Sequence, residues 1–467
     1  MSSSLTRWAV GLGLATVAMG LLLAHAARTQ EIAGAWHGRL QVPSGAALRI
    51  GLQVSRTPDG RLSGFLTSPD QTPHPIPLGT VRMEAGKLVF DAPAVGASYQ
   101  GAWDGARQAW AGKLKQGGLD MPLTFKKGPP PQQASAPATA RPQTPKPPFP
   151  YRSLDVAFDS VPGVRLAGTL TLPEGAGPFP AAVLITGSGP QDRDETILGH
   201  KPFLVLADNL TRRGIAVLRV DDRGVGQSTG ERADATTADF AKDTEAAVGF
   251  LRTRRDIDPA RIGLIGHSEG GIIAPMVADA DRRIAFVVLM AGSAVPGAEV
   301  LQSQREAIER LAGASPEAIA RTEAQLAKIS AAVADTTTPK QALARLETEF
   351  PGLPPARAKA VVDQLGSPWM RWFAAYDPRP ALEKLRIPVL ALNGSKDTQV
   401  VPQINVPAMR QALKDDPKAT VIELPGLNHL FQDAGTGAPS EYATIQETLS
   451  PLALKTIGDW VTAQTKR

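Results

Sequence analysis

Residues 261–275 read RIGLIGHSEGGIIAP, and this stretch indicates both a fold and a kind of chemistry. An apolar run leads into Gly266-His267-Ser268-Glu269-Gly270, and an apolar helical pattern follows at once. The pattern G-x-S-x-G between a buried strand and a helix is typical of a sharp turn that presents a serine nucleophile. Glycines flank the serine because larger side chains would collide where the chain nearly doubles back. We therefore predict a strand–turn–helix unit with Ser268 at its tip.

The same spelling occurs a second time, as GQSTG around Ser228. Here the apolar run at 215–220 is followed by residues 221–226 before the serine is reached, and no apolar helical pattern comes directly after it. The hydroxyl would therefore lie several residues beyond the tip of the strand. We predict that Ser268 is the nucleophile and that Ser228 belongs to a structural loop.

Apolar runs alternate with helical patterns from residue 151 onward. The runs lie at 181–186, 215–220, 261–266, 284–291, 387–393 and 420–425. Such an alternation is typical of a parallel sheet with helices on both faces. About 95 residues separate the fourth run from the fifth, far more than a usual crossover. We therefore predict an α/β fold with a mostly parallel sheet and a helical cap inserted at about residues 296–378.

A serine nucleophile needs a base, and only one histidine fits the expected order. In open sheets of this kind the triad follows the chain order Ser, acid, His. Of the six histidines only His429 follows Ser268, and it lies just past the last apolar run. His267 is next to the nucleophile, but its side chain would diverge from the hydroxyl. We predict His429 as the general base.

The acid that orients the base should follow the preceding strand. Asp397 lies four residues past Asn393, on a loop that contains a glycine. Asp377 and Asp433 are the alternatives. Asp377 precedes its strand, at the wrong edge of the sheet, and Asp433 follows the base too closely in sequence. We predict Asp397 as the acid, where it would hold the imidazole tautomer.

An oxyanion hole needs two backbone N–H groups aimed at the developing charge. One is expected from Glu269, directly after the nucleophile. The other is expected from the loop after 181–186, where Ser188 is our choice and Gly189 the alternative. The glycines of this loop would let the backbone approach the acyl carbon.

Three motifs together resemble the α/β-hydrolase superfamily over residues 151–467. They are the elbow GHSEGG, the loop TGSGPQDRD and the loop DDRGVGQS. The likeness is to an esterase branch grouped with serine aminopeptidase-like hydrolases, whose members often carry a signal peptide and a small β domain. One departure is Thr186-Gly187, where many relatives have His-Gly.

The resemblance implies an α/β-hydrolase fold and hydrolysis of small-molecule carboxylic esters through an acyl-enzyme. It implies no metal and no organic cofactor, and it assigns the triad to Ser268, Asp397 and His429. A serine peptidase, an aminopeptidase or a thioesterase would use the same triad and stays open as an alternative. A non-catalytic envelope-binding protein on this scaffold is a third hypothesis, against which the complete triad argues.

Four aromatic residues of the cap, Trp369, Trp372, Phe373 and Tyr376, have the spacing of one helical face. Such a stripe most often packs in a core, and lining of the acyl pocket is the alternative.

The N-terminal residues predict export. Residues 1–26 contain Arg7, then an apolar run, and end at the small-x-small site Ala24-His25-Ala26. This layout is typical of a secretory signal peptide. An uncleaved membrane anchor is the alternative, because the run is just long enough to span a bilayer. Both place the protein outside the cytoplasm, in the periplasm or the medium.

Two segments separate this signal from the α/β part. Residues 28–127 read as short strands and tight turns, which predicts a small antiparallel barrel or sandwich. Residues 128–150 are rich in proline and are predicted to form an extended linker. The solitary histidines His37 and His74 do not form a metal-binding pattern.

Composition excludes several classes of function. The chain has no cysteine, which excludes a cysteine nucleophile, a thiolate zinc site and a disulfide framework. The net charge of +5 is concentrated, since residues 121–154 contain five basic residues and no acid. A nucleic-acid-binding face is therefore not predicted. This basic segment reads as a solvated linker, with a weak contact to an anionic envelope surface as the alternative.

Overall fold

The computed structural model describes residues 32–41, 47–57, 60–68, 72–116, 119–128, 141–353 and 355–466. The chain divides into two compact units, Met1–Pro131 and Gln132–Arg467, and the boundary falls inside the predicted linker. The predicted signal peptide, residues 1–26, and its anchor alternative lie outside the described residues. In the part that is described, no helix has the length and apolar character needed to cross a membrane.

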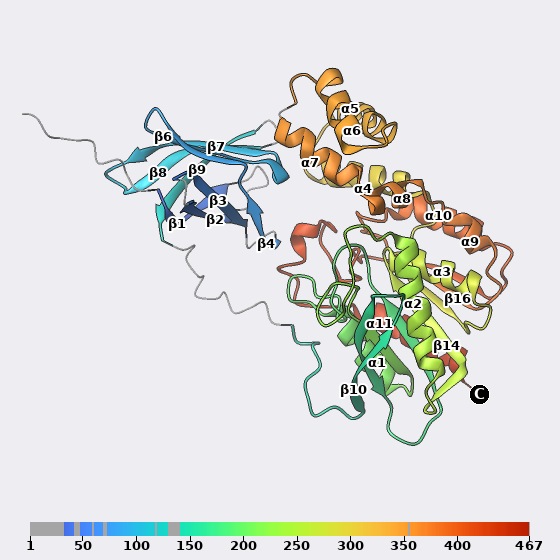
Figure 1. The fold of residues 1–467 in the computed structure, drawn as a ribbon. Coiled ribbons are helices and arrows are strands. Elements are labelled where there is room, and N and C mark those ends of the chain that lie inside the picture. The colour runs from blue at the N-terminus through green and yellow to red at the C-terminus, as the bar shows by residue number, and fades with distance from the viewer. Residues whose placement is uncertain are drawn as a thin grey trace, which may run out of the picture. The chain divides into compact units, whose positions relative to one another are not determined.

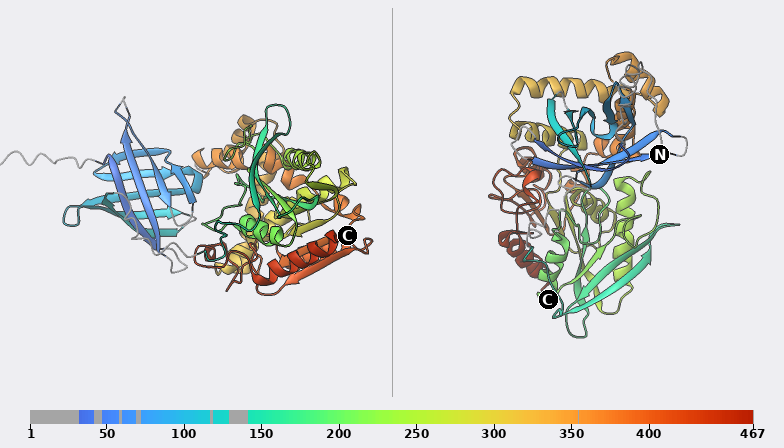
Figure 2. Two further views of the ribbon diagram at one scale, coloured as in Figure 1. Left: turned by 90° about the horizontal axis from the view of Figure 1, so that it is seen from below. Right: turned by 90° about the vertical axis from the view of Figure 1, so that its left-hand side faces the viewer.

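The first unit is an all-antiparallel barrel (Figure 2). Its strands within the described ranges are β1 (Gly34–Gln41), β2 (Ala47–Arg56), β3 (Leu62–Ser68), β4 (Thr72–Pro77), β5 (Thr80–Glu84), β6 (Lys87–Ala92), β7 (Ala97–Asp104), β8 (Ala109–Gln116) and β9 (Leu119–Lys127), with a short 3-10 turn at Pro93–Val95. The order is β2-β1-β9-β8-β7-β6-β5-β3-β4, and β2 also pairs with β3, which closes the sheet. Closure decides between the barrel and the sandwich that the sequence left open.

The interior of the barrel is filled by aromatic side chains. Trp36 and Trp110 are fully buried, and the Trp36 ring packs edge-on against Trp103, with centroids 6.1 Å apart. Phe90 and Tyr99 stack at 5.0 Å beside them. Large rings remove much apolar area from water, and this gives a small barrel a core of its own.

The second unit contains an eight-stranded mixed sheet in the described residues. Its strands are β10 (Arg152–Asp159), β11 (Arg165–Leu172), β12 (Phe179–Ile185), β13 (Ala216–Val220), β14 (Ile257–His267), β15 (Val287–Met290), β16 (Val389–Gly394) and β17 (Ala419–Leu424). The order is β10-β11-β13-β12-β14-β15-β16-β17, antiparallel up to the β11–β13 pair and parallel from there on. Every predicted run lies on a parallel strand, whereas the antiparallel strands β10 and β11 were not predicted.

Helices cover both faces of this sheet, as predicted (Figure 1). One core lies between the sheet and α1 (Pro202–Arg212) and α11 (Pro451–Thr465). The other lies under α2 (Thr237–Arg252), α3 (Gly270–Ala280), α9 (Arg379–Glu383) and α10 (Pro402–Ala412). The predicted α/β-hydrolase architecture is confirmed.

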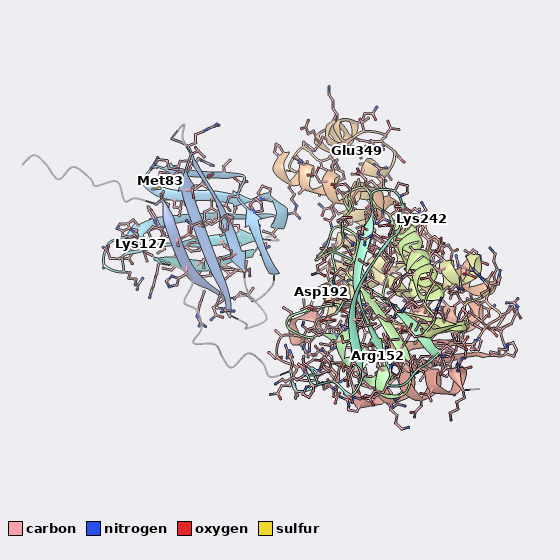
Figure 3. The ribbon with its side chains drawn as sticks, turned by 60° about the horizontal axis from the view of Figure 1, so that its bottom comes forward. Met83, Lys127, Arg152, Asp192, Lys242 and Glu349 are labelled. Atoms are coloured by element: carbon pink, nitrogen blue, oxygen red, sulfur yellow. The ribbon has the colours of Figure 1, made fainter. Side chains whose placement is uncertain are left out.

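Between β15 and β16 the described chain forms the short α9 and, before it, the five helices of the predicted cap. They are α4 (Gly297–Leu311), α5 (Pro316–Ala334), α6 (Pro339–Glu349), α7 (Pro355–Leu365) and α8 (Pro368–Ala375). Ser315 caps α5, since its hydroxyl accepts the Ala318 N–H at 3.2 Å. The Gly297 N–H donates to the Tyr376 carbonyl at 3.1 Å, so the two ends of the insertion lie side by side. Figure 3 labels Glu349 on this cap, Lys242 on α2 and Asp192 on the loop after β12.

The described part of the predicted linker, residues 141–150, lies against the second unit. Arg141 donates to the Leu198 carbonyl at 2.9 Å, and Gln143 donates to the Leu449 carbonyl at 2.7 Å. A short 3-10 turn at Pro439–Glu441 precedes α11 in the same region. These bonds give the C-terminal part of the segment a fixed path, although proline makes it poor at forming secondary structure.

Candidate active site

The elbow holds Ser268 in a conformation that few non-glycine residues adopt. Strand β14 ends at His267, helix α3 begins at Gly270, and Ser268 between them has a φ of +54°. A Cβ on Gly266 would lie 1.9 Å from the Gly270 carbonyl oxygen, and one on Gly270 would lie 2.2 Å from the Ile185 oxygen. Both flanking glycines are therefore required by close backbone contact, and the strain is localised at the serine.

Ser228 is held in a different way. Its side chain is buried, its hydroxyl donates to the Asp221 carbonyl at 2.7 Å, and the same oxygen accepts the Ala167 N–H at 2.9 Å. Both hydrogen-bonding directions of the hydroxyl are thus used on backbone groups. Such a hydroxyl joins the loop to β11, and no histidine is hydrogen-bonded to it in the described part of the chain.

His429 and Asp397 form a buried pair. The imidazole Nδ1 lies 2.9 Å from Asp397 Oδ2, on the loop after β16. The other carboxylate oxygen accepts the N–H groups of Gln399 at 2.8 Å and Val400 at 2.9 Å. Asn393 Nδ2 adds a bond to Oδ2 at 3.1 Å. A carboxylate with these donors can accept Nδ1–H, which leaves the Nε2 lone pair of His429 available to accept a proton.

The two alternative acids lie elsewhere. Asp377 is paired with Arg379, whose Nε donates at 2.8 Å, and Asp433 is exposed. Neither is hydrogen-bonded to His429 within the described ranges, and neither lines the cavity that contains Ser268. Asp397 is the acid that the structure places against the imidazole.

Ser268 and His429 line one cavity of about 480 Å³. Its wall also includes Gly187, Ser188 and Glu269 from the two loops of the predicted oxyanion hole. No hydrogen bond joins the Ser268 hydroxyl to His429 among the described residues. Rotation about a single side-chain bond can bring such a hydroxyl toward the base, and catalytic hydrogen bonds commonly tighten only when substrate binds.

Ser188 and Glu269 both line the cavity, and their N–H groups have no hydrogen-bond partner within the described parts of the chain. The Gly187 N–H, by contrast, already donates to Glu195 Oε1 at 2.7 Å. Gly189, the alternative donor, does not line the cavity. Thr186 stands where many relatives have the histidine of a His-Gly pair. Its hydroxyl donates to Asp222 at 2.7 Å and anchors this loop. The two N–H groups that the sequence predicts as oxyanion donors are therefore unpaired in the described residues, and their role stays a prediction.

A second histidine and its partner carboxylate lie beside the serine, and sequence reasoning missed their role. His267 Nδ1 lies 2.9 Å from Glu195 Oε1, and its Nε2 lies 3.0 Å from the backbone oxygen of His429. Burial by itself lowers the pKa of His267, but the charge of Glu195 and these hydrogen bonds outweigh it and hold the pKa above its ordinary value. The two residues are 72 positions apart. No local pattern could have paired them.

The aromatic stripe of the cap divides into two stacked pairs. Trp369 stacks on Phe373 with centroids 5.0 Å apart, and both line the cavity. Trp372 stacks on Tyr376 at 4.5 Å, and neither is among the described residues that line it. Half of the stripe therefore forms a wall of the site and half packs within the cap.

Comparisons with known proteins agree with this architecture. The model of the "Alpha/beta hydrolase family" matches residues 182–444. Esterase EstD of Thermotoga maritima is 31% identical over 284 residues, which cover 59% of this chain and 61% of that protein. Thiohydrolase apmlB of Arthrinium phaeospermum is 33% identical over 142 residues, with coverages of 30% and 43%.

A solved esterase from Pyrococcus furiosus is 16% identical with a TM-score of 0.43, and the match covers 68% of this chain and 92% of that one. The chain spans less than two thirds of the length of the two curated relatives named above. The family model nevertheless matches more than half of this chain, including the elbow, Asp397 and His429. The protein belongs to the alpha/beta hydrolase family.

Proposed function

We propose that this protein is an exported serine hydrolase that cleaves carboxylic esters of small molecules through an acyl-enzyme. The observation that carries the proposal is the composition of one cavity wall. It contains a strained serine, an imidazole paired with a buried carboxylate, and the N–H groups of Ser188 and Glu269, which are unpaired among the described residues. The likeness to a protein named esterase supports the ester as substrate class. The N-terminal residues 1–26 support export.

The proposed reaction uses groups of the chain and water. Ser268 Oγ attacks the ester carbonyl while His429 Nε2 takes its proton, and Asp397 stabilises the imidazolium. The carbonyl oxygen becomes an anion that accepts from the N–H groups of Ser188 and Glu269. The C–O bond to the alcohol then breaks, and the imidazolium returns its proton to the leaving oxygen. Water attacks the acyl-serine by the same route, and this releases the acid and restores the hydroxyl.

Thioester hydrolysis is the second candidate, because one relative is named a thiohydrolase. The same triad and donors serve both reactions, since a thiolate leaves more readily than an alkoxide. The peptidase alternative lacks a comparable observation.

The test compares two serine variants of the mature protein on a nitrophenyl ester, an acyl thioester and an aminoacyl anilide. Ser268→Ala should lower kcat by about 10³-fold or more, as removal of a serine nucleophile does in other triads. Ser228→Ala is the matched control. It removes a buried hydroxyl that is hydrogen-bonded to backbone groups and does not line the cavity, so it should lower stability by about 1 kcal/mol and leave kcat within about twofold.

Full activity of Ser268→Ala would refute the mechanism. Turnover of the anilide faster than the ester at equal concentration would refute the esterase assignment and favour a peptidase. Equal loss in both serine variants would show that the assay follows folding and not chemistry.

A further inference from the structure

Two buried titratable side chains beside the serine take no part in the proposed proton transfers. Glu195 is 1% exposed, and it has a φ of +52°, which is unusual for a residue with a side chain. His267 occupies the position just before Ser268 and is also buried. Buried charges and strained residues are costly, and they persist where the surrounding structure fixes them.

The hydrogen-bond partners define the protonation of His267. Its Nε2 lies 3.0 Å from the backbone oxygen of His429, and a carbonyl oxygen can only accept. Its Nδ1 lies 2.9 Å from Glu195 Oε1, an oxygen that also accepts the Gly187 N–H at 2.7 Å. The ring therefore fits the form with a proton on each nitrogen, paired with an ionised carboxylate.

This pair connects three segments that carry the proposed chemistry. Glu195 binds the first residue of the oxyanion loop, His267 belongs to the elbow, and the acceptor of its Nε2 is the backbone of the base. The contacts at the elbow are tight, since a Cβ on Gly187 would lie 3.2 Å from Ser268 Cβ. The rings of His267 and His429 lie 4.8 Å apart.

We propose that Glu195 and His267 are positioning residues of the active site. Asp397 holds the ring of His429, and the ion pair holds its backbone and sets the oxyanion loop against Ser268. The inference rests on the proposed function, because it assigns a task within that reaction. Both residues line the cavity, but within the described residues neither is hydrogen-bonded to the Ser268 hydroxyl or to the ring nitrogens of His429. We therefore expect the main effect on the rate of the chemical step and not on the affinity for substrate. Misplacement of a reacting group by about 1 Å can cost about 10²-fold in rate.

The test uses variants that break different arms of the pair. Glu195→Gln keeps the size of the side chain and an acceptor oxygen for Gly187, but it removes the charge that favours the second proton on His267. His267→Ala removes both bonds of the ring. His267→Gln should restore part of the loss, because its terminal amide can reach the position of Nε2 and donate to the His429 carbonyl.

The control is Asp281→Asn, which weakens an ion pair with Arg252 in the same unit. Asp281 follows the C-terminal end of α3, whereas the elbow lies at the N-terminal end. For each variant, kcat is expressed per serine labelled by a fluorophosphonate, and the urea midpoint is measured in parallel. We expect Glu195→Gln and His267→Ala to lower kcat by about 10- to 100-fold with KM changed less than about threefold. We expect Asp281→Asn to shift the midpoint with kcat within about twofold.

A kcat within about twofold of the wild type in Glu195→Gln and His267→Ala would overturn the positioning role and leave the pair a folding element only. No recovery in His267→Gln relative to His267→Ala would overturn the link to the backbone of the base. Ser268→Ala separates this failure from that of the proposed function. If it stays active, the triad is wrong; if it is inactive while the pair variants are fully active, only the present inference fails.

Discussion

Trp369 Nε1 of the cap donates a hydrogen bond of 2.8 Å to the carboxylate of Glu269, the residue after the serine. The Thr237 hydroxyl, at the start of α2, donates to the same oxygen at 2.7 Å. The side chain of Glu269 is therefore fixed from the cap and from the sheet domain together. Because the Glu269 N–H is a proposed oxyanion donor, the position of the cap is coupled to the geometry of the hole.

Replacement of Trp369 tests this coupling. Trp369→Phe keeps an aromatic ring to stack on Phe373 but removes the N–H donor to Glu269. A hydrogen bond to a charged group contributes about 1.5 to 3 kcal/mol, so we expect kcat/KM on a nitrophenyl ester to fall by about tenfold or more. Trp372→Phe is the control, since that ring stacks on Tyr376, just past the end of the same helix, and is not among the described residues that line the cavity. Equal losses in the two variants would contradict the coupling.

The elbow glycine Gly266 is expected to tolerate no side chain. A Cβ there would overlap the Gly270 carbonyl oxygen at 1.9 Å, and backbone cannot move aside without moving Ser268. We expect Gly266→Ala to lose about 3 kcal/mol or more of unfolding free energy, or to fail to fold, by urea denaturation. Gly249→Ala is the opposite case, because Gly249 lies within α2 with nothing near its Cβ position. This second variant should gain about 1 kcal/mol.

The buried pair predicts a definite pH dependence of stability. The pKa of His267 is raised above its ordinary value of 6.5, with Glu195, Asp397 and the backbone of His429 facing the ring. A raised folded pKa gives stability that is complete below the unfolded pKa and is lost as pH rises through the folded pKa. The advantage of the wild type over His267→Gln in unfolding free energy should therefore be complete below the ordinary pKa and shrink as the pH rises above it.

His200 offers a contrast of opposite sign. Burial lowers the pKa of His200, so the folded state holds it neutral and resists the proton that the unfolded chain takes up. The advantage of the wild type over His200→Gln should grow as pH rises from about 5 to about 7. Parallel trends in the two histidine variants would show that neither titration is responsible.

Most of the parallel strands could be predicted because they are buried on both faces and so form continuous apolar runs. The edge strand β17 is only partly buried, but it is also rich in apolar residues. The antiparallel strands β10 and β11 lack that signal. Strand β10 is largely exposed, and β11 is interrupted by Gly168, whose Cβ position would lie 2.3 Å from the Arg219 carbonyl oxygen of β13. In the sequence, a glycine that permits close approach of two strands interrupts the apolar run by which a strand is predicted. Closure of the first unit into a barrel could not be predicted from the sequence either, since it depends on the pairing of β2 with β3 and not on either strand alone.

Candidate site residues were accessible where chemistry imposes an order along the chain. Ser268, Asp397 and His429 follow such an order, and the elbow fixes where the first of them lies. Glu195 has no such constraint. Its role depends on a loop that brings it against His267, and only the folded chain shows that one carboxylate oxygen accepts from two segments. Contacts that stabilise a site from outside the reaction leave little trace in a single sequence.

The hydrogen bond between Gly297 and Tyr376 means that the chain enters and leaves the cap at one place. The flanking strands β15 and β16 are neighbours in the sheet, so their register is independent of how many helices the chain makes in between. The cap can therefore be replaced by another insertion, in evolution or by design, and the same sheet would then accept different substrates. The pairing of β15 with β16 does not depend on the cap, whereas the cap itself can vary.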